Sequence, residues 1–116
     1  MARAVPVSPP EFVFDSLRSP LEFRRVLRTG RRTRASGVTV ASLPRDDGPA
    51  AVGLVVNRSV GGAVQRNRVK RRLRHALREV ALPAARDYVV IASAQVGEVE
   101  YRDLVSWLKA AVKENV

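Results

Sequence analysis

The feature that most constrains this chain is a basic segment with the periodicity of a packed helix. Residues 58–78 contain eight Lys or Arg residues and no Asp or Glu. At about 100° per residue, one face of residues 66–80 carries an apolar stripe of Val69, Leu73, Ala76, Leu77 and Val80. The opposite side carries Arg68, Arg71, Arg74, His75 and Arg78, with Asn67 beside them and Lys70 and Arg72 at the margins. The pattern predicts a helix with one face in a core and the other free for a partner.

The sign of the charge indicates what that partner is. A solvated helix usually interleaves acidic and basic residues, because like charges three or four positions apart cost a few tenths of a kcal/mol each. Here Arg71, Arg74 and Arg78 follow one another at that spacing. The whole chain has a net charge of +10 and a pI of about 11.5. An anionic membrane suits an aliphatic, core-like stripe poorly, so a nucleic acid is favoured. The excess of Arg suits RNA as well as DNA.

Several other classes of function are excluded or disfavoured. The chain has no Cys and a single His, so thiol chemistry is excluded and we expect no metal site. No apolar run approaches the roughly 20 residues of a membrane span, and no signal peptide opens the chain, so we expect a cytoplasmic protein. Asp46 and Asp47 are adjacent carboxylates in a turn, and Gly61-Gly62 lacks the rest of a phosphate-loop motif. We therefore expect no catalytic side chains.

The remaining patterns predict an α+β fold in one domain. Residues 1–17 are expected to form an extended arm, and residues 18–116 an RNA-binding domain. Ser19-Pro20 is a typical helix start and Gly30 a typical helix end. β-favouring runs lie within 31–43, 50–56 and 87–93, and an amphipathic helix covers 101–115. The prediction is an α/β sandwich with three helices and a mixed sheet of about four strands, in the order α-β-β-β-α-β-α.

Residues 53–79, GLVVNRSVGGAVQRNRVKRRLRHALRE, resemble the signature of the bacterial ribonuclease P protein subunit. The most specific part is AVQRNRVKR at 63–71, and the layout agrees over about residues 18–114. The resemblance implies a left-handed strand–helix–strand crossover, which general preferences would disfavour.

The resemblance also implies a function. Such a protein is the accessory subunit of an endoribonuclease whose catalysis is carried by RNA. It binds the catalytic RNA and the 5′ leader of precursor tRNA, and Mg²⁺ held mainly by the RNA assists removal of the leader. Membranes, DNA and an obligate protein partner are not expected.

By the family pattern, two groups of residues would contact RNA. The RNA-subunit face would comprise Arg58, Arg66, Asn67, Arg68, Lys70, Arg71, Arg72, Arg74 and Arg78. The leader-binding cleft would comprise Phe23, Arg24, Leu27, Val38 and Val40. The chain departs from the family in the loop at 57–62, where two basic positions are lost, and at Leu27 and Ala41, where many members have aromatic residues. Phe12 or Phe14 of the arm are therefore candidates for stacking on the leader.

Two other functions fit the residues alone. A basic α+β domain with an extended arm also suits a structural ribosomal protein, which would copurify with ribosomal RNA. A DNA-binding regulator is a further alternative, although no helix-turn-helix spacing precedes the basic helix.

Overall fold

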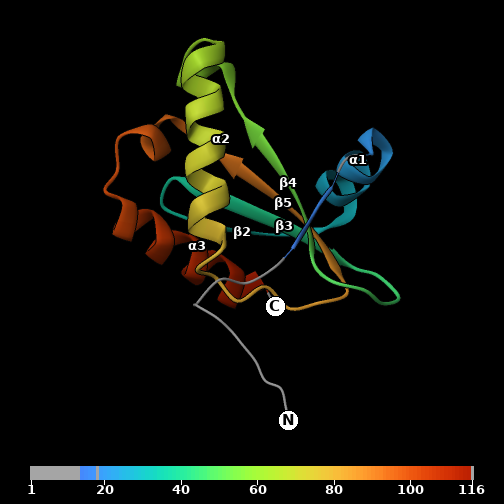
Figure 1. Cartoon of the computed structure of the whole chain (residues 1–116). Coiled ribbons are helices and arrows are strands. Elements are labelled where there is room, and N and C mark those ends of the chain that lie inside the picture. Colours follow the sequence, from blue (N-terminus) through green and yellow to red (C-terminus); the bar gives the residue numbers. More distant parts are fainter. Residues whose placement is uncertain (1–13, 18, 116) are drawn as a thin grey trace.

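The computed structural model describes residues 14–17 and 19–115. Its elements are β1 (Asp15–Ser16), α1 (Pro20–Thr29), β2 (Arg31–Ala35), β3 (Val38–Pro44), β4 (Ala51–Val56), the 3-10 helix η1 (Arg58–Val60), α2 (Ala63–Leu77), β5 (Arg86–Ala92), the 3-10 helix η2 (Ala94–Gly97) and α3 (Tyr101–Asn115) (Figure 1). From α1 onward, helices and longer strands follow the predicted order, so the α+β assignment is confirmed.

One strand precedes the predicted elements. β1 is only two residues long and pairs in parallel with Ala51 and Val52 of β4. The backbone N–H of Leu17 then donates to the Val52 carbonyl at 2.9 Å, and the Leu17 side chain is buried. Residues 14–17, which the sequence analysis assigned to the arm, therefore belong to the folded body. The rest of the predicted arm, including Phe12, lies outside the described residues.

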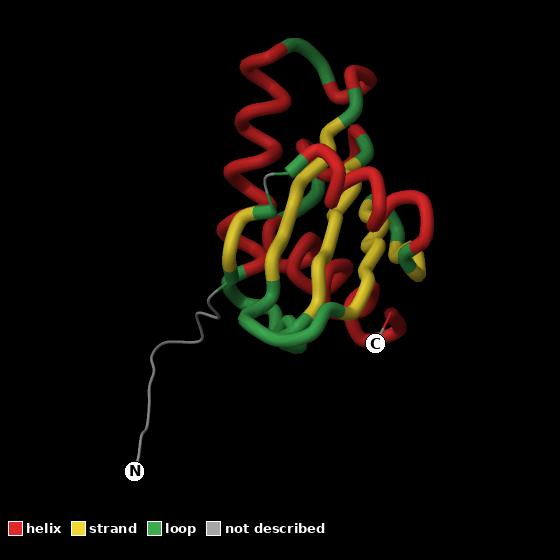
Figure 2. The backbone as a smooth tube through the Cα atoms, turned by 90° about the vertical axis from the view of Figure 1, so that its right-hand side faces the viewer, coloured by secondary structure: helices red, strands yellow, loops and turns green. Residues whose placement is uncertain are grey.

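The sheet has the strand order β1-β4-β5-β3-β2. β4 and β5 are parallel neighbours, whereas β3 is antiparallel to both β5 and β2. α2 connects β4 to β5, and the view of Figure 1 shows this crossover to be left-handed, as the resemblance implied. The four longer strands run side by side in Figure 2, with α2 standing along one side of the sheet.

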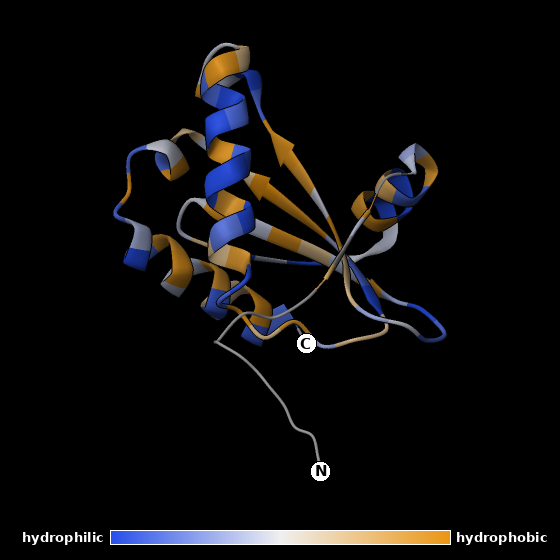
Figure 3. Ribbon diagram, in the orientation of Figure 1, coloured by the Kyte–Doolittle hydropathy of each residue, from blue (hydrophilic) through white to orange (hydrophobic). Residues whose placement is uncertain are grey.

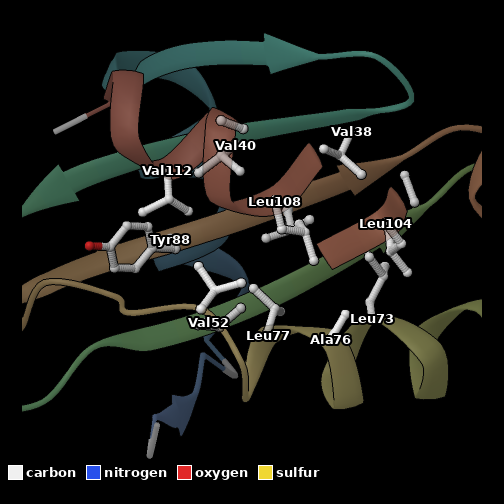
Figure 4. Packing of buried hydrophobic residues seen from close by; sticks show 14 of the residues in the cluster. Val38, Val40, Val52, Leu73, Ala76, Leu77, Tyr88, Leu104, Leu108 and Val112 are labelled. Carbon is white, nitrogen blue, oxygen red and sulfur yellow. The ribbon is translucent and has the colours of Figure 1, made fainter. Parts of the chain in front are cut away.

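The two faces of the sheet carry different helices. α2 and α3 cover one face, over a core that includes Leu73, Leu77, Tyr88, Leu104 and Leu108, all fully buried (Figure 4). α1 covers part of the other face, where a smaller cluster contains Leu17, Val26, Ala41, Ala51 and Val89. Figure 3 shows hydrophobic strands beside an α2 that is largely hydrophilic on its outer side.

Local signals explain where α1 begins and ends. The Ser19 hydroxyl accepts from the backbone N–H of Glu22, and Pro20 occupies the first helical position, as predicted. Gly30 ends the helix, but in extended backbone rather than the left-handed region. A Cβ at position 30 would lie 2.4 Å from the Val26 carbonyl oxygen and 2.8 Å from that of Ser42. Glycine is thus required by the close approach of two backbones.

Candidate nucleic-acid interface

α2 presents the predicted basic face. Val69, Leu73, Ala76 and Leu77 are buried against the sheet and α3, so the apolar stripe is confirmed. Val80, the last residue of the stripe, is also buried, although the helix ends at Leu77. The side chains on the outer side are exposed, namely Asn67, Arg68, Arg71, Arg74, His75 and Arg78. Because the stripe fixes the rotation of the helix, these groups are held together on one surface.

The start of α2 is organised by local hydrogen bonds. The Gln65 side-chain oxygen accepts from the Gly62 N–H at 3.1 Å. Arg66 is half-buried, and its guanidinium reaches the Gly61 carbonyl at 3.5 Å. Arg58 is exposed on η1, just before this turn. Gly61 has a φ of 141°, a backbone conformation that favours glycine. Arg58 and Arg66 therefore stand at one end of the basic face.

Arg72 does not belong to the free basic face. Its side chain is half-buried, and its two terminal nitrogens donate to the backbone carbonyls of Val96 and Val99. The guanidinium thus ties α2 to η2 and the loop before α3. The two carbonyls take two of the five guanidinium N–H donors, so Arg72 has fewer donors free for RNA than its exposed neighbours, and its RNA contact stays a prediction.

A hollow of about 300 Å³ lies between the edge of β4 and α2. It is lined by Phe14, Ser16, Leu17, Phe23, Val52, Gly53, Leu54, Lys70 and Arg74. Aromatic rings from the N-terminal segment and α1 therefore meet cationic side chains from α2. The predicted cleft residue Phe23 and the candidate Phe14 are both here.

Gly53 makes this arrangement possible. A Cβ at position 53 would lie 2.2 Å from Cζ of Phe23, so the ring rests directly on the β4 backbone. Any larger residue would push the ring off the strand or bend the strand away. The absence of a side chain at one position thus sets the height of an aromatic ring above the sheet.

The face of the sheet that α1 covers also has a row of partly exposed side chains beside the helix. Val55, Ile91 and Thr39 lie in one row across β4, β5 and β3, because Val55 pairs with Ile91 and Ile91 with Thr39. All three side chains are half-buried, and Val55 and Ile91 pack against the same buried cluster as Phe23 and Leu27. We call this row and its wall at Phe23 and Leu27 the trough.

The structure corrects the predicted strand residues of the cleft. Val38 and Val40 are 1% and 0% exposed and face the core beneath α2 and α3. Successive strand residues point to opposite faces, so Thr39 and Ala41, not the valines, face α1. The valines go to the side with two helices because that side buries more apolar surface. Thr39, Val55 and Ile91 were missed, and strand alternation was the signal that could have found them.

Among the described residues, no ion pair compensates the basic face of α2. Across residues 14–17 and 19–115, two ion pairs form: Arg45 with Asp87 at 2.9 Å, and Arg102 with Glu100 at 3.6 Å. Neither involves a residue of α2. The like charges on α2 thus lie close together without an ion-pair partner among the described residues, as expected of a surface that meets a polyanion.

The described part of the chain offers neither a metal-ligand cluster nor a membrane-spanning helix. No three His, Cys, Asp or Glu side chains in the described part of the chain come together as a metal site would need. No helix in that part is long and apolar enough to cross a membrane.

Comparison with known proteins identifies the family. The family model for ribonuclease P matches residues 14–115. The ribonuclease P protein component of Thermobifida fusca is 38% identical over 109 residues, which cover 85% of this chain and 74% of that protein. The chain belongs to the ribonuclease P protein family. The protein component of Thermus scotoductus is 43% identical over 100 residues, which cover 86% of this chain. The matched part spans only about three fifths of that relative, 59% of its length.

Solved ribonuclease P proteins share the fold. The protein from Thermotoga maritima superposes with a TM-score of 0.76 at 23% identity, covering 86% of this chain and 96% of that one. The Staphylococcus aureus protein gives a TM-score of 0.73 at 21% identity, covering 85% and 93%. At such identities the likeness supports the architecture alone.

Proposed function

We propose that this chain is the protein component of ribonuclease P, an accessory subunit that binds a catalytic RNA and the 5′ leader of precursor tRNA. Family membership gives the framework. The observation that carries the proposal is the hollow in which Phe14 and Phe23 meet Lys70 and Arg74. It joins groups that stack on unpaired bases to groups that bind phosphates.

In this proposal the exposed face of α2 binds the RNA subunit. Arg68, Arg71, Arg74 and Arg78 present guanidinium groups, which bind phosphate oxygens in pairs of hydrogen bonds. The buried stripe beneath them holds the surface rigid, so a structured RNA meets fixed charges. Arg72 contributes by holding the adjacent loop, as its contacts with Val96 and Val99 indicate.

The hollow and the trough are proposed to hold the leader. Stacking on aromatic rings tolerates any base, which suits a segment whose sequence differs from one precursor to another. Phe23 belongs to both regions, and Lys70 and Arg74 supply positive charge at the hollow. Leu27 and Ala41 offer no ring, so Phe14 takes the place of the missing aromatic residues.

The chemistry is assigned to the RNA. In the proposal, Mg²⁺ is held mainly by the RNA, and this chain's side chains bind and orient the substrate. A cytoplasmic location is part of the same proposal.

Reconstitution tests the proposal. The purified chain is added to a transcribed bacterial ribonuclease P RNA at low Mg²⁺, and cleavage of precursor tRNA is followed. Restored cleavage at the mature 5′ end is expected. Binding to the RNA without restored cleavage would overturn the proposal and leave α2 as a general RNA surface.

The role of α2 is tested by the triple substitution Arg68→Gln, Arg71→Gln and Arg74→Gln. The log–log salt dependence of RNA affinity should flatten by roughly 0.7 to 0.9 for each phosphate contact removed. The matched control changes Arg102, Lys109 and Lys113 to Gln, three exposed cations on α3. An equal change in both variants would mean that net charge alone matters.

The role of the hollow is tested by Phe23→Ala. Affinity for precursor tRNA should fall more than affinity for mature tRNA, because only the precursor has a leader. Val26→Ala is the control, since Val26 lies on the same helix but is 1% exposed. Equal losses for the two RNAs in Phe23→Ala would give Phe23 a purely structural role.

A further inference from the structure

A second run of arginines lies outside α2. Residues 24–34 contain six Arg and no Asp or Glu, so this run has as many cationic residues as α2. They belong to α1 and β2, and all six are exposed. No ion pair of the described residues involves any of them. The predicted leader-binding cleft includes only Arg24 of the six, and the proposed function gives the other five no role.

Four of the six arginines can serve one surface. Along β2, Thr33 faces α3, where it accepts from the side chain of Asn115, so Arg31 has the same orientation and is left out. Arg32 points to the other face, and its guanidinium donates to the Leu27 carbonyl at the end of α1, at 2.7 Å. On α1, Arg25 lies about 160° around the helix axis from Leu27 and is also left out. The α1–β2 arginine surface is therefore defined as Arg24, Arg28, Arg32 and Arg34.

This surface continues the trough. Thr39, the last residue of the trough row, pairs with Arg34 on β2. In the neighbouring row Gly53, beneath Phe23, aligns with Val89 and Ala41 and then with Arg32. Both rows thus run from β4, which lines the hollow, across β5 and β3 to an arginine on β2 at the opposite edge of the sheet. On α1, which forms the wall of the trough, helical spacing places Arg24 beside Leu27. Arg28 lies one helical turn after Arg24 on the same side.

We propose that the α1–β2 arginine surface binds phosphates of the leader beyond the part held in the trough. The inference rests on the proposed function, because it extends the path of the same single strand. A strand that stacks on Phe23 and crosses the floor of Val55, Ile91 and Thr39 arrives at Arg34 and Arg32. Electrostatic attraction there needs no particular base, as backbone contacts carry no sequence information.

Continuity favours the leader over a second structured RNA helix. Arg32 and Arg34 stand at the end of the two rows that run across the sheet beside α1. Two of the guanidinium groups are also fixed by the chain itself, since Arg32 binds the Leu27 carbonyl and Arg34 Nε donates to the Ser36 carbonyl at 3.2 Å. Their positions are thus set before RNA arrives, which lowers the entropy lost on binding.

The test varies leader length in the reconstituted holoenzyme. The double variant Arg28→Gln/Arg34→Gln removes two charges at exposed positions, and Gln at position 28 is a good helix former. The control is Lys109→Gln/Lys113→Gln on α3. Precursor affinity is measured for a series of leaders that lengthen one nucleotide at a time.

For the wild type and the control, affinity should keep rising as the leader reaches past the trough. For the double variant, affinity should stop rising at a shorter leader length, and the longest leaders should bind about five-fold more weakly. Its log–log salt slope should be lower by roughly 1.4, for those leaders only. Leaders that end within the trough should bind all three proteins equally.

Two outcomes overturn the inference. An equal loss for every leader length would mean that the surface contacts the RNA subunit or the tRNA body. No loss at any length would mean that the arginines are only solvated. Failure of the proposed function looks different, because the wild type would then fail to support cleavage of even the shortest-leader precursor.

Discussion

α1 and α2 are both basic helices, but they are anchored in different ways. α2 buries four side chains in the larger core, and Arg72 ties it to the loop that follows β5. α1 buries only Val26 completely and rests on small residues such as Gly53 and Ala41. Sequence charge alone does not separate the two helices. The difference in anchoring suits α2 to a fixed binding surface and α1 to the wall of a groove.

The largest expected effect tests this difference in anchoring. Leu73→Ala removes a fully buried side chain beneath α2 and should lower the free energy of unfolding by about 2–5 kcal/mol. Val26→Ala under α1 removes fewer atoms and should lower it by about 1–2 kcal/mol. Urea denaturation measures both. A larger loss for Val26→Ala would reverse the assigned order of the two helices.

Alkaline pH should act on the α2 and α3 side of the sheet. Burial raises the pKa of Tyr88 to about 12, against a smaller opposing effect of Arg86. The folded state therefore keeps the proton that the unfolded state releases near pH 10. The stabilisation is complete below pH 10 and is lost as the pH rises toward 12, by about 2–3 kcal/mol in all.

The free energy of unfolding is measured by urea denaturation between about pH 9 and pH 12, a range that spans the pKa values of Tyr88 in the unfolded and the folded state. Tyr88→Phe is the comparison, although it also removes the hydrogen bond to the Pro83 carbonyl. Its stability should depend less steeply on pH. Equal slopes for the two proteins would contradict the assignment to Tyr88.

Gly53→Ala should damage the α1 side selectively. The new Cβ would overlap the Phe23 ring, and such overpacking costs about 1–3 kcal/mol. Displacement of the ring should also weaken precursor binding while RNA-subunit affinity stays unchanged. Loss of RNA-subunit affinity as well would show that the two sides of the sheet are coupled.

Arg72→Met should give the smallest effect on stability, about 1–2 kcal/mol, because it keeps the apolar stem but removes two partly exposed hydrogen bonds. Its salt slope for RNA binding should match that of the wild type, whereas Arg71→Met should flatten it. A flattened slope in Arg72→Met would restore Arg72 to the RNA-binding face.

Much of the fold could be predicted because its signals are local. The α2 stripe and the cap at Ser19 follow from spacing within a few residues. β1 could not be predicted, since two residues show no periodicity and their pairing is with residues far along the chain. The faces of β3 were assigned wrongly because Val38 and Val40 were taken as cleft residues without comparing the two sides of the sheet.

The candidate site shows the same division. Helical spacing placed Arg68, Arg71 and Arg74 correctly on an exposed face. It put Arg72 at the margin, but nothing local indicates that its partners are carbonyls 24 and 27 residues away. The hollow depends on Phe14, Phe23 and Lys70 coming together from three separate segments, which only the tertiary fold determines.

The short length of β1 has a consequence for the protein without RNA. β1 pairs only with Ala51 and Val52, so the outer edge of β4 from Gly53 onward has no strand neighbour among the described residues. An open edge can pair with another copy and start aggregation. The net charge of +10 keeps copies apart by repulsion. The charge that is proposed to attract RNA thus also keeps the free protein soluble, and we expect salt to promote self-association when RNA is absent.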